Sequence, residues 1–406
     1  MTSRFPDAFR CGVAADTVRL PTGAPIAGYG GRGRRVLPCR IERRRPFVRF
    51  FRPSAGQRDP IRVKAMVVIE GDRRLLFLSL DVVAVPPDLH DEILRTVEPL
   101  GFPRDGVMVS ATHTHSGPGG LTRARTWQLV VMDAFSRLVH DAIVTAVIGA
   151  VRGAVGRAEP ASLSTVSFAA DGLQRSRRHD RWFFDPTVNL LLARSTINTR
   201  WIGAMANMAI HGTALQDNNL LLSADVPGAI ERSLERQLGA PVLFVNGAVG
   251  DVSPIMAGTE GINYIAHAFG QQCAAAIPRA RRVTPRWSVF RRRLRLPAPH
   301  LLSRMPIGGL VPREVELNLI RLGDLAMLTW PGEPTTTLGL AAKGVAGDAG
   351  TGQPWILGLT NGYAGYFVAP DEHRAGGYEA AKSFYGATAG ITLVEAYRAL
   401  LSGSDS

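Results

Sequence analysis

Short apolar runs alternate with longer helical patterns along the whole chain, and this alternation limits most strongly which folds the sequence can adopt. Runs rich in β-branched residues and leucine predict strands within 65–71, 74–83, 106–112, 187–195, 240–247, 314–323 and 325–330. Spacings with helical periodicity predict helices near 127–151, 225–237, 262–277, 334–345 and 389–402. Interleaved strands and helices predict an α/β fold in which layered, mixed β-sheets are flanked by helices.

Some of the predicted strands should pair in antiparallel fashion. The stretch from Lys64 to Val83 reads as two strands joined at Gly71 and Asp72, which predicts a hairpin. The Pro- and Gly-rich stretch 297–313 has no clear periodicity, so we interpret it as a long loop that contacts substrate or covers a site. A chain of 406 residues with 46% hydrophobic residues can bury a large core.

The net charge of +13 raises the question of a polyanionic partner. Only Lys64, Lys343 and Lys382 are lysines, and the arginines are spread along the chain. Around residues 287–296 the arginines alternate with other residues, which is typical of a half-exposed strand with a basic outer face. We therefore expect solvated arginine side chains, and no nucleic-acid partner.

The cysteines and the N-terminus bear on the cellular compartment. Cys11, Cys39 and Cys273 are widely spaced and form no CxxC pair, which disfavours a disulfide framework. The first 20 residues lack the apolar run of a secretory signal. The predicted helix 127–151 carries charged residues, so we expect a buried amphipathic helix and no stable membrane insertion. These features together predict a cytoplasmic protein.

Polar residues follow several predicted strands, at the positions where α/β folds place their functional groups. Two histidines lie one residue apart in "VSATHTHSGPGG", and other candidates follow later apolar runs. The candidate side chains are His113, His115, His211, Ser253, Glu333, Tyr363 and Tyr366.

Taken singly, each candidate has an ordinary structural explanation. His113 and His115 on one strand would point to opposite faces. If the backbone leaves the strand at Thr114, the glycines that follow could allow both imidazoles to face one pocket. His211 could be a hydrogen-bonded core histidine, and Glu333 could interact with the dipole of a helix.

Two imidazoles and a carboxylate are also the ligands that catalytic zinc sites use. Zinc polarises a carbonyl group and lowers the pKa of a bound water. The HExxH pattern of many metalloproteases is absent from the sequence, so the spacing of these residues does not by itself demonstrate a metal.

The sequence resembles the neutral (non-lysosomal) ceramidases, specifically their N-terminal catalytic domain. The similarity extends over roughly residues 10 to 400. It is carried by "THTHSGPGG", "IHGTALQDNNLLLSADVPGA", "GDVSP", "PGEPTT" and "NGYAGYFVAPDE…YEAA", in this order. Similar stretches are "ADTVRLPTGAPIAGYGGR", "LSLDVV" around Asp81, and "LQRS" containing Arg175. The resemblance implies a single catalytic domain over 1–406, without the immunoglobulin-like C-terminal module of that family.

Each functional residue of the family can be matched to a position in this sequence. The resemblance implies a zinc ion held by His113, His211, Glu333 and Tyr363. It also implies that Ser253 is the catalytic serine and that His115 and Arg175 lie beside it. Tyr363 is chosen over Tyr366 because it matches the N-x-Y pattern. Whether Ser253 or a metal-bound water attacks the substrate stays open.

Neutral ceramidases cleave the amide bond of N-acylated sphingoid bases and can run the reaction in reverse as acyl transfer. This sequence has Ile255 where the family has asparagine and Pro334 where it has phenylalanine. We therefore predict a zinc-dependent amidohydrolase whose small-molecule N-acyl substrate is smaller or more polar than ceramide. Two alternatives are an ester or lactone hydrolase or acyltransferase with the same site, and a non-catalytic polyanion-binding protein. The oligomeric state is not predicted.

Overall fold

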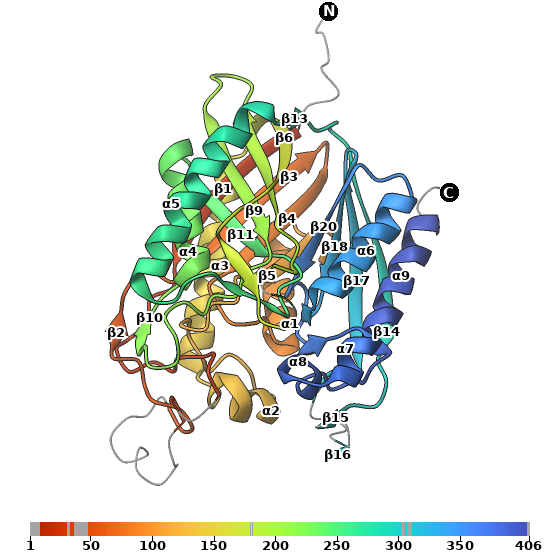
Figure 1. Ribbon diagram of the computed structural model, residues 1–406. Helices are drawn as coiled ribbons and strands as arrows, with labels where there is room; N and C mark the ends of the chain where they lie inside the picture. Colours follow the sequence, from red (N-terminus) through yellow and green to blue (C-terminus); the bar gives the residue numbers. More distant parts are fainter. Residues whose placement is uncertain are drawn as a thin grey trace, which may run out of the picture.

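The computed structural model describes residues 9–30, 33–35, 48–178, 180, 182–301, 305–306 and 311–403. Over these residues, two β-sheets pack together and helices cover their outer faces (Figure 1). The larger, nine-stranded sheet has the order β11 (Val242–Asn246), β9 (Trp201–Met208), β8 (Thr187–Ser195), β6 (Glu159–Ala169), β1 (Phe9–Thr17), β3 (Arg62–Glu70), β4 (Arg73–Leu80) and β5 (Val107–Ala111), with β13 (Arg281–Arg282) on β6. The second sheet has the order β14 (Trp287–Arg295), β17 (Glu314–Leu322), β18 (Leu325–Trp330) and β20 (Gln353–Gly358).

Four short ladders complete the strands that the structure describes. They are β2 (Gly56–Gln57) with β10 (Leu221–Leu222), β7 (Gln174–Ser176) with β12 (Val252–Pro254), β15 (His300–Leu301) with β16 (Met305–Pro306), and β19 (Glu333–Pro334) with β21 (Tyr366–Phe367). The α-helices are α1 (Pro87–Val97), α2 (Arg125–Trp127), α3 (Arg137–Gly156), α4 (Asp225–Leu238), α5 (Gly258–Ala276), α6 (Thr336–Asp348), α7 (Pro370–Ala375), α8 (Tyr378–Ala381) and α9 (Ala389–Gly403).

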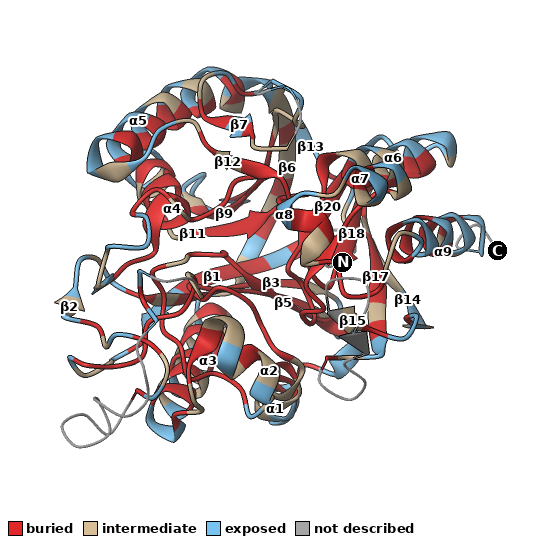
Figure 2. Cartoon of the chain, turned by 60° about the horizontal axis from the view of Figure 1, so that its bottom comes forward, coloured by how far each residue is buried: buried red, intermediate tan, exposed pale blue. Residues whose placement is uncertain are grey.

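Three clusters of buried apolar side chains hold these layers together. The first joins α1 and α3 to β3, β4 and β5 and continues under α6 and α9. The second fills the space between the two sheets, where Phe77 and Met205 of the large sheet meet Met327 and Trp355 of the small one. The third joins α4 and α5 to β8, β9 and β11. Figure 2 shows that the strands between these helices are almost entirely buried, as expected for sheets covered on both faces.

The layered α/β architecture predicted from the sequence is confirmed. The predicted hairpin is present as β3 and β4, which pair in antiparallel fashion from Val63 opposite Leu80 to Glu70 opposite Arg73. Part of the predicted loop at 297–313 lies outside the described residues. Cys39 also lies outside them. Cys11 and Cys273 are buried free thiols.

The predicted helix over 127–151 is wrong in its first part. The chain forms α2, then a π-turn over Gln128–Met132, and α3 begins only at Arg137. The interruption centres on Asp133, which adopts φ 62° and is buried. Its carboxylate accepts hydrogen bonds from the backbone N–H groups of Arg49, Phe50, Phe51 and Ala134. Only the Ala134 donor is local; the other three belong to the segment 49–51, so a tertiary contact holds Asp133 in a conformation that interrupts the helix.

By length and composition alone, α3 could cross a membrane. Core helices have the same properties, and α3 packs against β1 and β3.

The contact between α3 and β1 depends on a glycine, which gives a testable prediction. A Cβ on Gly12 would lie 2.0 Å from the carbonyl oxygen of Ala154. We expect Gly12→Ala to lower the free energy of unfolding by about 1–3 kcal/mol, because α3 must move away from the sheet. Gly156, at the end of α3, has no atom within 4 Å of a built Cβ. Gly156→Ala should therefore leave the urea midpoint unchanged or slightly higher, and an equal loss in both variants would contradict the prediction.

Strands from both sheets end in one region of the molecule. The segment after β20 bonds to β5, because the N–H of Ala111 donates to Leu359 and that of Asn361 donates to Val109. The segments after β9 and β11 are joined by the hydrogen bond from Gly247 N–H to the Met208 carbonyl. The loops that carry the candidate residues therefore meet at the carboxyl ends of these strands, the usual location of α/β functional sites.

Candidate metal centre and active site

His113 and His115 lie just beyond β5 and face the same cavity. The strand ends at Ala111, and His113 adopts the left-handed conformation with φ 67°. This reversal breaks the strand alternation that would separate the two side chains. The imidazole ring centroids lie 4.7 Å apart. The sequence suggested a bend at Thr114 made possible by the glycines that follow, but the reversal lies at His113 itself.

His211 follows β9 and lies against the same loop. The backbone of Thr114 bridges to Gly212 in parallel fashion, and the His115 N–H donates to the Gly212 carbonyl. A Cβ on Gly212 would lie 2.7 Å from the Cα of Thr114, so glycine is needed for this close approach. The centroid of the His211 ring lies 4.6 Å from that of His113.

Glu333 reaches the cavity from the second sheet. It follows β18 and lies on β19, opposite Tyr366 of β21. Its Oε2 atom lies 3.1 Å from Nε2 of His113 and 3.2 Å from Nε2 of His211. The hydroxyl of Tyr363 donates to the other carboxylate oxygen at 2.6 Å. Two imidazoles and one carboxylate, from three segments about 100 and 120 residues apart in sequence, thus converge on one point.

The tautomers of the two histidines show what this point requires. Nδ1 of His113 contacts the carbonyl of Val83 at 2.6 Å, and Nδ1 of His211 contacts that of Val252 at 2.9 Å. A neutral imidazole that donates from Nδ1 carries a lone pair on Nε2. Both Nε2 atoms therefore direct lone pairs towards the Glu333 carboxylate, whose Oε2 has no hydrogen-bond donor among the described residues.

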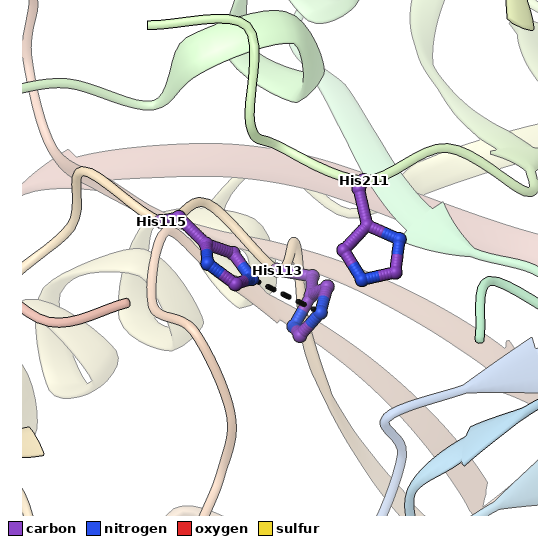
Figure 3. A group of neighbouring side chains, drawn as sticks. All are labelled: His113, His115 and His211. Atoms are coloured by element: carbon purple, nitrogen blue, oxygen red, sulfur yellow. Dashed lines mark hydrogen bonds between the residues drawn. The ribbon is translucent and has the colours of Figure 1, made fainter. Parts of the chain in front are cut away.

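Such an arrangement of buried lone pairs is repulsive unless a cation or protons lie between them. The carbonyls that fix the Nδ1 atoms are also the outer partners that metal-binding histidines use. His115 completes the group, with its Nε2 atom 3.3 Å from that of His113 (Figure 3). The ligand atoms of the three histidines lie within 4.8 Å of one another, so the donor set fits a divalent metal such as zinc.

The electrostatics of the cavity favour the same protonation states. Burial, followed by the charge of Arg177, lowers the pKa of His211 to about 3. Burial and the neighbouring His113 hold the pKa of His115 well below its ordinary value. Burial alone would raise the pKa of Glu333, but the positive charge and hydrogen bonds that protonated imidazoles at His113 and His211 would supply outweigh it and hold the pKa well below the usual range. A metal ion at the same point would supply that charge in place of the protons. Neutral imidazoles beside an ionised carboxylate are the protonation states that metal binding requires.

Both candidate tyrosines reach this centre. Tyr363 contacts Glu333, whereas the hydroxyl of Tyr366 lies 3.4 Å from Nε2 of His211. Burial raises the pKa of each phenol well above its ordinary value. The geometry therefore brings both Tyr363 and Tyr366 within reach, and His115 is a further candidate for the same coordination position.

Arg175 in β7 and Arg177 just after it differ in their positions. Arg175 pairs with Ser253 across β7 and β12, and its side chain is exposed. Arg177 instead contacts the Tyr366 hydroxyl at 3.0 Å and the Gly250 carbonyl at 2.7 Å. Glu379 positions Arg177 through a 2.8 Å ion pair. Sequence analysis missed Arg177; its signal was the run of arginines that follows "LQRS".

Ser253 is half-buried and directly follows Val252, whose carbonyl contacts His211. The preceding residue, Val252, accepts hydrogen bonds from both the backbone N–H and Nδ1 of His211. Ser253 itself is not among the residues that line the two cavities at the histidine cluster.

Two connected cavities open at the histidine cluster and share His115, Tyr366 and Tyr378. The larger measures about 860 Å³ and is bordered by Arg177, Arg178 and several carboxylates. The smaller measures about 320 Å³ and reaches His113, Glu333 and Tyr363. Volumes of this order suit a small-molecule substrate.

The sequence profile of the family described as "Neutral/alkaline non-lysosomal ceramidase, N-terminal" matches residues 49–282 and 300–395. This chain belongs to that family. It is 23% identical to the neutral ceramidase of Mycobacterium tuberculosis over 82% of this chain and 70% of that protein. The neutral ceramidase of Pseudomonas aeruginosa is 26% identical over 47% of this chain and 31% of that protein.

Solved structures of ceramidases share the fold. The crystal structure of neutral ceramidase from Pseudomonas aeruginosa superimposes with a TM-score of 0.85 at 18% identity, covering 98% of this chain and 74% of that one. A structure described as "Ceramidase complexed with C2" gives 0.86 at the same identity. The resemblance inferred from the sequence motifs is therefore confirmed. Membership of the ceramidase family supports hydrolysis of an N-acyl amide bond in a small-molecule substrate.

Proposed function

We propose that this protein is a zinc-dependent amidohydrolase that cleaves an N-acyl bond in a substrate smaller or more polar than ceramide. The observation that carries the proposal is the convergence of the Nε2 lone pairs of His113 and His211 on Glu333, around a point that needs a cation. Tyr363 and Tyr366 compete for the remaining ligand position. Bound there, zinc would polarise the amide carbonyl and stabilise negative charge on its oxygen.

The protein's own residues supply the other requirements of the reaction. His115 is half-buried, its pKa is held well below the ordinary value, and its Nδ1 atom has no hydrogen-bond partner among the described residues. It is placed to transfer a proton to the leaving amine. Arg177 presents its guanidinium at the cavity wall, where it can stabilise charge on the substrate oxygen. The attacking group is either Ser253 or a water molecule.

Removal of the metal tests this proposal directly. We expect the purified protein to contain about one zinc per chain by elemental analysis, as a single site of this kind requires. Dialysis against a chelator should abolish cleavage of N-acyl amides, and added zinc should restore it, because the carbonyl is no longer polarised without the ion. Full activity in a metal-free preparation would contradict the proposal. The same assay with an ester or lactone, and with an added acceptor amine, distinguishes amide hydrolysis from the ester and acyl-transfer alternatives.

The cellular location stays a proposal as well. The buried free thiols of Cys11 and Cys273 are compatible with a reducing compartment. Fractionation of cells that express the native protein would test the predicted cytoplasmic location.

A further inference from the structure

The smaller cavity beside the histidine cluster has an unusual combination of walls. Apolar residues make up much of its lining: Val83, Trp127, Val130, Val131 and Phe384. Two cationic residues, Arg35 and Lys382, also line it. Apart from Glu333, which belongs to the metal-binding group, the residues that the structure describes contribute no carboxylate to this lining.

Lys382 stands out among the lysines of the chain. Lys64 is fully buried between Asp81 and Glu231, and Lys343 pairs with Asp185 at 2.6 Å. Lys382 is half-buried at the end of α8, and over the described part of the chain its ammonium group has no acidic partner. A solvated surface lysine needs no partner, but this one borders an apolar cavity next to the reaction centre.

Arg35 adds a second positive charge to the same cavity. Its guanidinium donates to the carbonyls of Gly30, at 3.1 Å, and Leu129, and it lies over the ring of Phe51. Backbone carbonyls hold the group in place, and because Arg35 is exposed, solvent screens its charge. The cavity thus has apolar walls and two cationic residues whose charges no described carboxylate balances.

The larger cavity has the opposite balance of charge. It is lined by Asp217, Asp371, Glu372 and Glu379 against Arg177 and Arg178. Carboxylates in excess suit an amine, which is protonated after release at neutral pH. Because the two cavities meet at His115 and Tyr366, the amine half of a substrate fits the larger cavity and the acyl half fits the smaller one.

We propose that the acyl group cleaved by this protein carries a terminal carboxylate, which Lys382 binds with help from Arg35. This inference rests on the proposed amidohydrolase function and specifies its substrate class. Methylene groups of the acyl chain would lie against Trp127 and Phe384, with the amide carbonyl at the histidine cluster. The reaction consumes one water: its oxygen bonds to the acyl carbon, the C–N bond breaks, and both protons of the water pass to the nitrogen. The products are an ammonium ion and a dicarboxylate.

Matched pairs of amides test the proposal. Each pair shares one amine and one acyl carbon count, as in succinyl with butanoyl, adipoyl with hexanoyl, and suberoyl with octanoyl. A charged hydrogen bond in a partly buried site contributes about 1.5–3 kcal/mol, so at one length kcat/KM should be about 10- to 100-fold higher for the carboxylated member. Lys382→Met should remove that preference and leave kcat/KM for the uncharged member within about 2-fold.

Two further variants serve as controls. Lys382→Arg retains the charge and should keep much of the preference, whereas Lys343→Met removes a lysine outside both cavities and should keep all of it. Calorimetry with adipate and hexanoate provides a readout that does not depend on turnover. Adipate should bind more tightly than hexanoate to the zinc-loaded protein, and Lys382→Met should abolish the difference.

The outcomes separate this inference from the proposed function. Equal cleavage of both members of every pair, or a carboxylate preference that persists in Lys382→Met, would overturn the dicarboxylate inference and leave the amidohydrolase proposal intact. If no amide in the panel is cleaved while zinc is bound, the amidohydrolase proposal fails and the inference falls with it.

Discussion

Glu333→Gln is expected to release the bound metal and to lower kcat/KM for N-acyl amides by at least about 10²–10³-fold. The carboxylate supplies the negative charge that offsets a divalent cation in a fully buried site, and an amide of the same shape cannot supply it. The imidazoles of His113 and His211 would remain, but neutral ligands cannot compensate the charge of the ion. Elemental analysis of the purified variant, together with its activity at saturating zinc, measures both effects.

A second buried glutamate provides the matched control. Glu372 is also almost fully buried, and its carboxylate accepts hydrogen bonds from Thr335, Thr337 and the Ala369 backbone. Glu372→Gln should therefore lower stability and retain the metal. If Glu333→Gln keeps its zinc, or if Glu372→Gln loses it equally, the carboxylate of Glu333 is not a ligand. Circular dichroism of both variants shows whether they have folded.

The motifs predicted the location of the site better than the role of each residue. The pattern of polar residues after strands led to His113, His211 and Glu333, and the structure brings these three side chains together because the ends of strands in packed sheets converge. The bend at His113 was foreseen only as a condition, since a left-handed histidine cannot be read from its neighbours alone. The orientation of Arg177 towards Tyr366 depends on its ion pair with Glu379, which lies about 200 residues away in sequence.

Several acidic residues within the family motifs stabilise the loops around the site. Asp225, in "SADVPGA", accepts hydrogen bonds from the N–H groups of Ala214 and Leu215 and so shapes the turn after His211. Asp251, in "GDVSP", accepts hydrogen bonds from the N–H and hydroxyl of Thr336 at the start of α6. Such residues accompany the functional ones in sequence because they fix the loops that carry them. Sequence patterns alone do not separate the two roles, whereas hydrogen-bond partners do.

Asp81, in "LSLDVV", belongs to a buried ion cluster. Its carboxylate and that of Glu231 in α4 share the ammonium group of Lys64, at 2.6 and 2.8 Å. All three side chains are fully buried, and Arg62 adds an ion pair to Glu231 at 3.1 Å. The cluster joins β3, the end of β4 and α4, close to the loop that begins at Val82 and supplies the Val83 carbonyl to His113. It therefore stabilises the scaffold beneath the site.

Lys64→Met is expected to lower the free energy of unfolding by about 3–5 kcal/mol, because two buried carboxylates lose the cation that they share. Lys343→Met is the matched control: its ion pair with Asp185 is partly exposed, so the loss should be about 1 kcal/mol or less. Urea denaturation of the two variants and the wild type measures the difference. Equal losses in the two variants would contradict a special role for the buried cluster.

The pH dependence of this loss provides a second, independent check. Burial already raises the pKa of Glu231, and Lys64 opposes that shift. Without Lys64 the folded-state pKa of Glu231 should rise further above its unfolded value, so the folded variant binds more protons than the unfolded chain. Stability then decreases as pH rises through the raised pKa and recovers as pH falls towards about 4–5, where the carboxylate is protonated.

The difference in stability between wild type and Lys64→Met should consequently be larger at about pH 8 than at about pH 5. A constant difference across this range would mean that lost packing of the lysine side chain, and not uncompensated charge, causes the destabilisation.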